Sequence, residues 1–179
     1  MKRKLLNPNQ ILTLRDYPVH NEQILKIYFR MYDKGQRDLV PPSPVIHKNK
    51  VIHLMSRKFK KYTRFINQLI TFLDANPKIE YFLIDGSHKT SAATLTHKPI
   101  SVVVIENNDD LKASKKLIES GEILGWYKPP KTIDNIVMDL VKHHSTSKNF
   151  LTVEDKVNRM IKDRILPRYI IKAYKAGMK

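Results

Sequence analysis

Cysteine is absent from this chain of 179 residues. A protein without cysteine has no thiol nucleophile, no disulfide and no cysteine-ligated zinc, and such a composition fits a reducing cytoplasm. No uninterrupted apolar run approaches the roughly 18 residues of a membrane-spanning helix, so we expect no membrane partner. The basic start of the chain leads into no apolar segment, and we expect no secretory signal there.

Acidic residues are scarce relative to basic ones. The chain has 33 lysines and arginines against 17 aspartates and glutamates, which gives a net charge of +16. A field of this sign concentrates polyanions near the surface, so nucleic acid, nucleotides and anionic surfaces are the partners to consider. High lysine content also occurs as a solubility or thermophile trait, and the charge alone does not choose between these explanations.

Glycine is also sparse, with five residues, and Gly86 lies in the most informative stretch. The apolar residues 81–84 predict a buried strand, Asp85 and Gly86 follow, and a helix of small residues begins near Ser87. A strand that turns through glycine into a helix leaves backbone N–H groups directed at one spot, which attracts an anion, typically a phosphate. The ordinary alternative is a strand-to-helix turn with Ser87 as the N-cap and its lysine in solvent.

Side chains that carry chemistry are almost contiguous in this turn: Asp85, Ser87, His88, Lys89, Thr90 and Ser91. A lysine near a helix N-terminus is disfavoured by ~0.3–1 kcal/mol, so Lys89 is better explained if an anion binds there. We therefore predict a phosphate-binding turn made of Gly86, Ser87, His88, Lys89 and Thr90. The stretch lacks the earlier glycine of a Walker A loop, and P-loop chemistry is not predicted.

The apolar spacing predicts an α/β (α+β) fold, a small mixed sheet with surrounding helices. Expected helices cover 20–34, 56–75 and 87–96, with another from Asp109 or Asp110 to about Ser120; expected strands cover 80–85 and 100–105. In the first helix we expect a buried face of Ile24, Ile27, Tyr28, Met31 and Tyr32. Residues 45–46 and 51–54 suggest a hairpin or two short strands. The α/β domain is expected over 1–125 and an α-helical C-terminal extension over 126–179, with a capping box at Thr152 and Asp155.

The stretch from Leu83 to Lys89, followed by an alanine-bearing helix and the strand 100–105, resembles the ParB/sulfiredoxin-like fold. The resemblance spans roughly residues 10–106, and Lys89 stands where arginine is usual in that fold. The absence of cysteine excludes sulfiredoxin activity, and the Gly-Glu-Arg-Arg turn and helix-turn-helix domain of ParB partition proteins are not evident. The free-serine kinases of this fold carry a later Pro-Pro-Lys-Thr stretch, which residues 129–132 resemble.

The resemblance implies a nucleotide whose phosphates lie on residues 86–89, with Glu22 as a base beside an acceptor hydroxyl. Phosphoryl transfer depends mainly on positioning and positive charge, which suits this turn. Asp85 could hold Mg²⁺, and His88 could donate to a phosphate or shuttle a proton. The expected ligands are ATP or ADP with Mg²⁺, and the expected activity is that of a small-molecule kinase or nucleoside triphosphatase. Glu22 is equally well explained as a first-turn acid that stabilises the helix dipole.

A DNA- or RNA-binding protein of the same fold, of partition or nuclease type, is the alternative. Basic residues crowd the first turns of the expected helix 56–75: Arg57, Lys58, Lys60, Lys61 and Arg64. Because a helix N-terminus repels cations, this arrangement favours an anionic partner, unless the cluster is simply a solvated face. Cations also interleave with Tyr169 and Tyr174 near the C-terminus. Trp126 and Tyr127 could stack on an adenine or fill a hydrophobic gap, the histidines show no metal-ligand spacing, and a non-catalytic regulator stays open as a third class.

Overall fold

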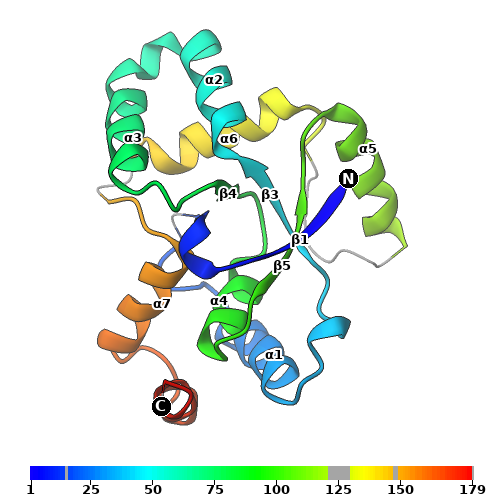
Figure 1. Cartoon of the computed structure of the whole chain (residues 1–179), viewed down its shortest axis with the longest axis vertical. Helices are drawn as coiled ribbons and strands as arrows, with labels where there is room; N and C mark the ends of the chain where they lie inside the picture. The colour runs from blue at the N-terminus through cyan, green and yellow to red at the C-terminus, as the bar shows by residue number, and fades with distance from the viewer. Residues whose placement is uncertain (15, 121–129, 147–148, 179) are drawn as a thin grey trace.

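The computed structural model describes residues 1–14, 16–120, 130–146 and 149–178. It is a mixed α/β fold, as the sequence predicts, with helices on both faces of one sheet (Figure 1). The five strands are β1 (Lys2–Leu6), β2 (Ile11–Leu12), β3 (Ser43–His47), β4 (Tyr81–Leu83) and β5 (Ile100–Val104). Their order across the sheet is β1-β5-β3-β4-β2. The β1/β5 and β3/β4 pairs are antiparallel, and the β3/β5 and β2/β4 pairs are parallel.

Alternation along the strands separates two hydrophobic cores. In β4, Tyr81 and Leu83 face one core and Phe82 faces the other, because successive side chains of a strand point to opposite faces. The same alternation places Val45 and Ile46 of β3 in different cores. Each core is therefore closed by its own set of helices.

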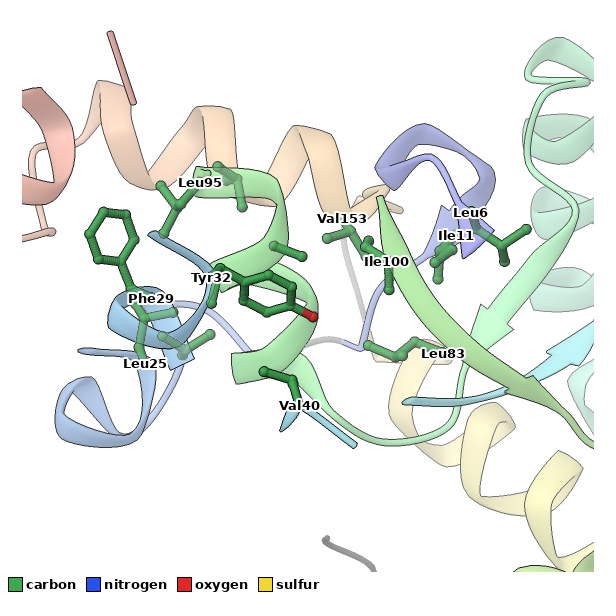
Figure 2. Close-up of a cluster of buried hydrophobic side chains, with 14 of the residues drawn as sticks. Leu6, Ile11, Leu25, Phe29, Tyr32, Val40, Leu83, Leu95, Ile100 and Val153 are labelled. Carbon is green, nitrogen blue, oxygen red and sulfur yellow. The ribbon is translucent and has the colours of Figure 1, made fainter. Parts of the chain in front are cut away.

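One face of the sheet is covered by α1 (Glu22–Asp33), α4 (Ser87–Leu95), α7 (Val153–Lys162) and α8 (Arg168–Ala176). Helix α4 lies at the centre of this group, where α1 and α7 pack against it. Figure 2 shows the core between them, with Leu25, Phe29 and Tyr32 of α1 near Leu95 of α4, and with Val153 of α7 near Ile100 of β5. The start of α4 is thus surrounded by segments from both ends of the chain.

The opposite face is covered by α2 (Lys48–Lys58), α3 (Thr63–Ala75), α5 (Asn108–Glu119) and α6 (Ile133–His144). Three short 3₁₀ segments complete the described elements: η1 (Pro8–Gln10), η2 (Arg37–Leu39) and η3 (Lys60–Tyr62). Helices α6 to α8, which lie in the predicted C-terminal extension, supply side chains to both cores. In the ranges that the structure describes, none of the helices has the length and apolar character needed to cross a bilayer.

The predicted buried face of α1 was right at Tyr32, which is buried, and wrong at Ile24 and Ile27. Leu25, Phe29 and Tyr32 are the buried residues, whereas Ile24 and Ile27 are 38% and 57% exposed. Two apolar stripes lie one residue apart on this helix, and both satisfy helical spacing. Packing against α4 buries the stripe of Leu25, Phe29 and Tyr32, and Tyr32 belongs to both stripes.

Residues 51–54 form part of helix α2, so the predicted second strand was wrong. Val51 and Met55 are fully buried at i, i+4 spacing, and the His47 side chain accepts a hydrogen bond from the Asn49 N–H, 3.2 Å away, at the helix start. The helix predicted over 56–75 is confirmed over α3 (Thr63–Ala75), but its predicted start was wrong, since α2 ends at Lys58 and η3 separates the two helices. Short apolar runs fit both periods, and here the i, i+4 pair decides.

Capping contacts explain the helix starts near the C-terminal half. Thr152 and Asp155 form the predicted capping box at α7. At α5 the N-cap is Asn107, with Asp110 as its capping-box partner, so the prediction that Asp109 or Asp110 caps this helix was wrong by a few residues. Asparagine is among the strongest N-cap residues, which accounts for the earlier start.

Candidate functional site

The turn between β4 and α4 has the backbone that the sequence predicts. Gly86 adopts φ +100°, in the left-handed region, and α4 begins at the next residue. A Cβ at this position would lie 2.5 Å from the Ser43 Oγ, so both conformation and space require glycine. No side chain of the described residues caps α4, so its positive end is not neutralised by a capping group.

Two of the predicted phosphate-binding side chains serve the interior of the protein. The Thr90 hydroxyl donates to the Gly86 and Ser87 carbonyl oxygens at 3.1 and 3.2 Å. Lys89 is 3% exposed, and its Nζ donates to the Pro42 carbonyl oxygen at 3.3 Å. Burial lowers the pKa of Lys89 to about 8, and the nearby Asp85 carboxylate opposes that shift. Lys89 therefore supplies positive charge beneath the turn rather than on its open side.

Ser87 belongs to a polar cluster that joins three distant segments. Its hydroxyl donates to the Asp16 Oδ1 at 2.9 Å. Lys156 of α7, only 1% exposed, donates from Nζ to the same Asp16 oxygen at 2.9 Å and approaches the Ser87 Oγ at 3.4 Å. Burial lowers the pKa of Lys156, and the Asp16 carboxylate opposes the shift. The second Asp16 oxygen, Oδ2, has no hydrogen-bond partner among the described residues.

His88 lies half-buried between α1 and α4. Its Nε2 accepts a hydrogen bond from the Asn21 N–H at 3.3 Å, and its ring packs edge-on against His20 with centroids 4.8 Å apart. Burial lowers the pKa of His88, and the His20 ring adds to that effect, while the Asp16 and Asp85 charges oppose it. The accepted hydrogen bond requires a lone pair on Nε2, so the neutral imidazole carries its proton on Nδ1.

Glu22 lies at the start of α1, next to the residue that contacts His88. Its carboxylate forms an i, i+4 ion pair with Lys26, and its side chain is 51% exposed. Asn21, not Glu22, provides the N-cap of this helix by accepting from the Gln23 and Ile24 N–H groups. The structure therefore brings the backbone of α1 to the turn and directs the Glu22 carboxylate along its own helix.

A surface hollow borders this cluster. One part, of about 520 Å³, is lined by Asp16, Tyr17, Lys142 and His143. A second part, of about 290 Å³, shares Lys142 and His143 and adds the mostly apolar wall of Leu14, Ile84, Pro130, Ile136, Asp139 and Leu140. The shared residues make the two parts neighbours, with a polar end at Asp16 and an apolar end beside the strand that leads into Asp85.

The Pro-Pro-Lys-Thr stretch reaches the same region. Pro130 lines the apolar end of the hollow, and the Thr132 hydroxyl caps α6 by accepting from the Asn135 N–H at 3.2 Å. Lys131 is exposed between them. Pro129, Trp126 and Tyr127 lie outside the described residues.

Sequence reasoning missed Asp16, Lys156 and Lys142 as members of this site. Lys156 stands three residues after Val153 and one before Val157, both fully buried, so a cation inside an apolar stripe was the available signal. Nothing in the local pattern around Asp16 points to the cluster, because its partners Ser87 and Lys156 lie on other elements. Lys142 is an exposed residue of α6 that forms an ion pair with Asp139 on the same helix and lines the hollow.

The basic cluster predicted on the first turns of one helix is divided among three elements. Arg57 and Lys58 lie in the last turn of α2, Lys60 and Lys61 in η3, and Arg64 in the first turn of α3. The expectation that all five face a helix N-terminus was wrong, because a helix C-terminus stabilises the first two. All five side chains are exposed, and Lys58 forms an ion pair with Asp134.

Of the two tyrosines among the C-terminal cations, Tyr174 packs against another part of the protein. Tyr174 stacks on His97 with centroids 4.7 Å apart and donates to the Asn158 Oδ1 at 2.8 Å. Arg159 lies over the Tyr17 ring, 4.4 Å from its centroid.

Within the ranges covered by the structure, no group of three or more histidine and carboxylate side chains lies close enough together to hold a metal ion.

Comparison of the chain with protein-family models, with curated proteins and with solved structures finds no match.

Proposed function

We propose that the turn at the start of α4 binds the phosphates of a nucleotide. The observation that carries the proposal is the convergence of Lys89, Lys156 and His88 on an uncapped helix start with a left-handed glycine, beside a hollow. A phosphate at this point would interact with the positive helix end and with the charges beneath it. Two buried lysines are costly unless anions neutralise them, and Asp16 and Asp85 supply part of that neutralisation.

The chemistry best suited to such a site is phosphoryl transfer, by a small-molecule kinase or a nucleoside triphosphatase acting in the cytoplasm. ATP or ADP would enter with Mg²⁺, and Asp85 stands next to the turn where the ion could bind. The resemblance of Leu83 to Lys89 to the ParB/sulfiredoxin-like fold supports the same assignment. The apolar end of the hollow, lined by Leu14, Ile84 and Leu140, offers a surface for a nucleobase.

A thermal-shift panel tests the proposal. ATP and ADP, each with and without Mg²⁺, should raise the melting temperature of the wild-type protein, since a ligand at 100 times its dissociation constant stabilises by ~2.7 kcal/mol. His88→Ala should remove most of the shift, whereas His53→Ala, which changes an exposed histidine of α2, should leave it intact. If no nucleotide stabilises the wild-type protein under any of these conditions, the proposal fails.

Nucleic-acid binding is a second candidate, favoured by one observation. The five cations Arg57, Lys58, Lys60, Lys61 and Arg64 are exposed on adjoining elements, in a protein of net charge +16. Contacts of this kind engage the phosphate backbone without reading sequence. Binding would then weaken steeply with salt, unlike binding of a single nucleotide at α4.

A further inference from the structure

Strand β1 is an open edge of the sheet in the part of the chain that the structure describes. It is the outermost strand and, among the described strands, it pairs only with β5 (Figure 1). The opposite edge, β2, is covered by a bridge between Leu12 and Thr152 and by a hydrogen bond from the Thr13 N–H to the Leu151 carbonyl oxygen. Residues 2–5 are all exposed. Because an edge strand directs some of its backbone N–H and C=O groups away from its neighbour, β1 can accept a further strand.

The side chains of β1 are basic on both faces of this edge. Successive residues of a strand point to opposite faces, so Lys2 and Lys4 share the face of the buried Leu6, and Arg3 and Leu5 share the other. An incoming strand would therefore meet cations whichever way its side chains point.

Part of this charge is already used within the protein. The Lys4 Nζ donates to the Tyr81 hydroxyl at 2.8 Å, and Lys2 forms an exposed ion pair with Glu106 at 3.5 Å. The stronger positive potential is expected on the opposite face, where Arg3 lies.

A pocket of about 420 Å³ lies on the Arg3 face, and we call it the β1 pocket. Arg3 and Leu5 of β1 line it together with Ser101 of β5, which is the register partner of Leu5. Its remaining wall is the segment 37–42, which contains η2 and two successive prolines. The proline-containing wall is stiff, so the pocket lies preformed beside the strand edge.

Two guanidinium groups and two exposed leucines border the β1 pocket. Guanidinium groups bind carboxylates through paired hydrogen bonds, and Arg3 and Arg37 both reach this pocket. The Asp38 carboxylate, 91% exposed, lies 3.4 Å from the Arg37 Nε and offsets part of that charge. Leu5 and Leu39 are 56% and 67% exposed, and exposed apolar groups rimmed by polar ones are typical of interaction sites. The pocket suits a carboxylate that stands next to an apolar side chain.

We propose that β1 binds an acidic, extended segment of a partner protein, which adds to the sheet as a further strand and places alternate side chains over the β1 pocket. In this binding mode, main-chain hydrogen bonds provide affinity, and pockets for alternate side chains provide specificity. The partner segment carries acidic residues opposite Lys2, Arg3 and Lys4 and an apolar residue opposite Leu5. This role is independent of the nucleotide proposed at α4.

A second copy of this chain fits the edge poorly. Pairing of two β1 strands would bring Lys2, Arg3 and Lys4 of one copy close to the same three cations of the other, and like charges opposite one another destabilise a strand pair. Cations on an edge strand are a common device against such self-pairing. That device does not by itself account for the pocket and the exposed leucines beside the strand.

Fluorescence anisotropy with a labelled peptide tests the proposal on the full chain. The probe is fluorescein-labelled Gly-Ser-Val-Glu-Glu-Glu-Val-Ser-Gly, in which valines flank three glutamates, so it fits β1 in either strand direction. We expect this peptide to bind, and a version with three glutamines to bind about tenfold or more weakly. Arg3→Ala and Arg37→Ala should each weaken the acidic peptide by about fivefold or more. Arg57→Ala, the matched control at an exposed arginine of α2, should stay within about twofold of the wild type.

Backbone methylation distinguishes strand addition from simple charge attraction. Two further peptides carry N-methyl groups on alternate residues, one at the odd positions and the other at the even positions. A strand presents the N–H groups of alternate residues to its neighbour. One pattern should therefore abolish binding, and the other should keep the affinity within about threefold.

Four results would overturn the proposal. The first is no binding of the acidic peptide at protein concentrations up to about 1 mM, and the second is an equal effect of the two methylation patterns. The third is displacement of the peptide by an oligothymidylate as readily as by unlabelled peptide, since the cations would then hold any polyanion. The fourth is a wild-type dimer in sedimentation that Arg3→Ala dissociates, which would assign the edge to a second copy. If Arg3→Ala fails to fold, Arg37→Ala and the methylated peptides, which leave β1 unchanged, still decide.

Discussion

Gly86 is the residue on which the geometry of the turn depends. An alanine there would have to adopt φ +100°, and its Cβ would lie 2.5 Å from the Ser43 Oγ. We expect Gly86→Ala to lower the free energy of unfolding by more than the ~1 kcal/mol typical of a left-handed position alone. Gly35 is the control, since it has φ +73° and, within the described part of the chain, its Cβ would meet no atom within 4 Å. Equal losses for Gly86→Ala and Gly35→Ala in chemical denaturation would contradict the close packing of the turn.

The burial of His144 makes the stability of the folded protein depend on pH in the acid range. Its ring is 3% exposed among Phe82 and Phe150, and its Nε2 has no hydrogen-bond partner within the described ranges. Burial lowers its pKa from 6.5 to about 4, with a smaller contribution from His143. Between these two values the unfolded chain binds a proton that the folded protein does not, so stability falls as the pH falls from about 6.5 to about 4.

Replacement of His144 should remove this dependence. The gap between the two pKa values corresponds to about 3 kcal/mol, so the stability of the wild type should fall by roughly that much more than the stability of His144→Leu across this pH range. His143→Leu, at the exposed neighbouring position, should keep the wild-type slope. Parallel stability curves for wild type and His144→Leu, from urea denaturation at a series of pH values, would show that the histidine is not buried in its neutral form.

At the scale of elements, α8 packs against α4 and makes a polar contact with His97, two residues after the end of α4. Ile170 is fully buried, and the His97 Nε2 lies 2.8 Å from the Tyr174 carbonyl oxygen. We expect Ile170→Ala to lower the free energy of unfolding by about 2–5 kcal/mol, as for other buried large-to-small changes. Ile165→Ala removes a side chain that is 39% exposed and should cost much less. If the two variants unfold at the same denaturant concentration, α8 does not contribute to the cooperative core.

Some of these elements and contacts could be predicted from the sequence, and others could not. The β4–Gly86–α4 turn was predictable because an apolar run, a glycine and a helix of small residues are all local signals. The buried face of α1 was only partly predictable, since two apolar stripes one residue apart satisfy the same helical period. The extent of α2 was not predictable, because its short apolar run fits both the strand and the helix periods. The Asp16–Ser87–Lys156 cluster was beyond local reasoning, because each member comes from a different element and their contact arises from the packing of α7 on α4.

At the scale of the whole molecule, the net charge of +16 predicts affinity for polyanions. If nucleic acid binds over α2, η3 and α3, log affinity should fall steeply with log salt concentration, by about 0.9 per phosphate contacted on a duplex. Replacement of Lys60, Lys61 and Arg64 by alanine should reduce that slope by about two to three. A matched triple replacement of Arg168, Lys172 and Lys175 in α8 should have a smaller effect. Equal effects of the two variants would mean that binding reflects overall charge and not this surface.

Calorimetric titration with ADP, inorganic pyrophosphate and adenosine tests the central claim most directly, because it asks whether phosphate groups provide the binding energy. The account predicts that ADP and pyrophosphate both bind, that adenosine binds at least tenfold more weakly than ADP, and that His88→Ala weakens ADP and pyrophosphate alike. Adenosine binding as tight as that of ADP, or no binding of any of the three, would contradict a phosphate site at the start of α4.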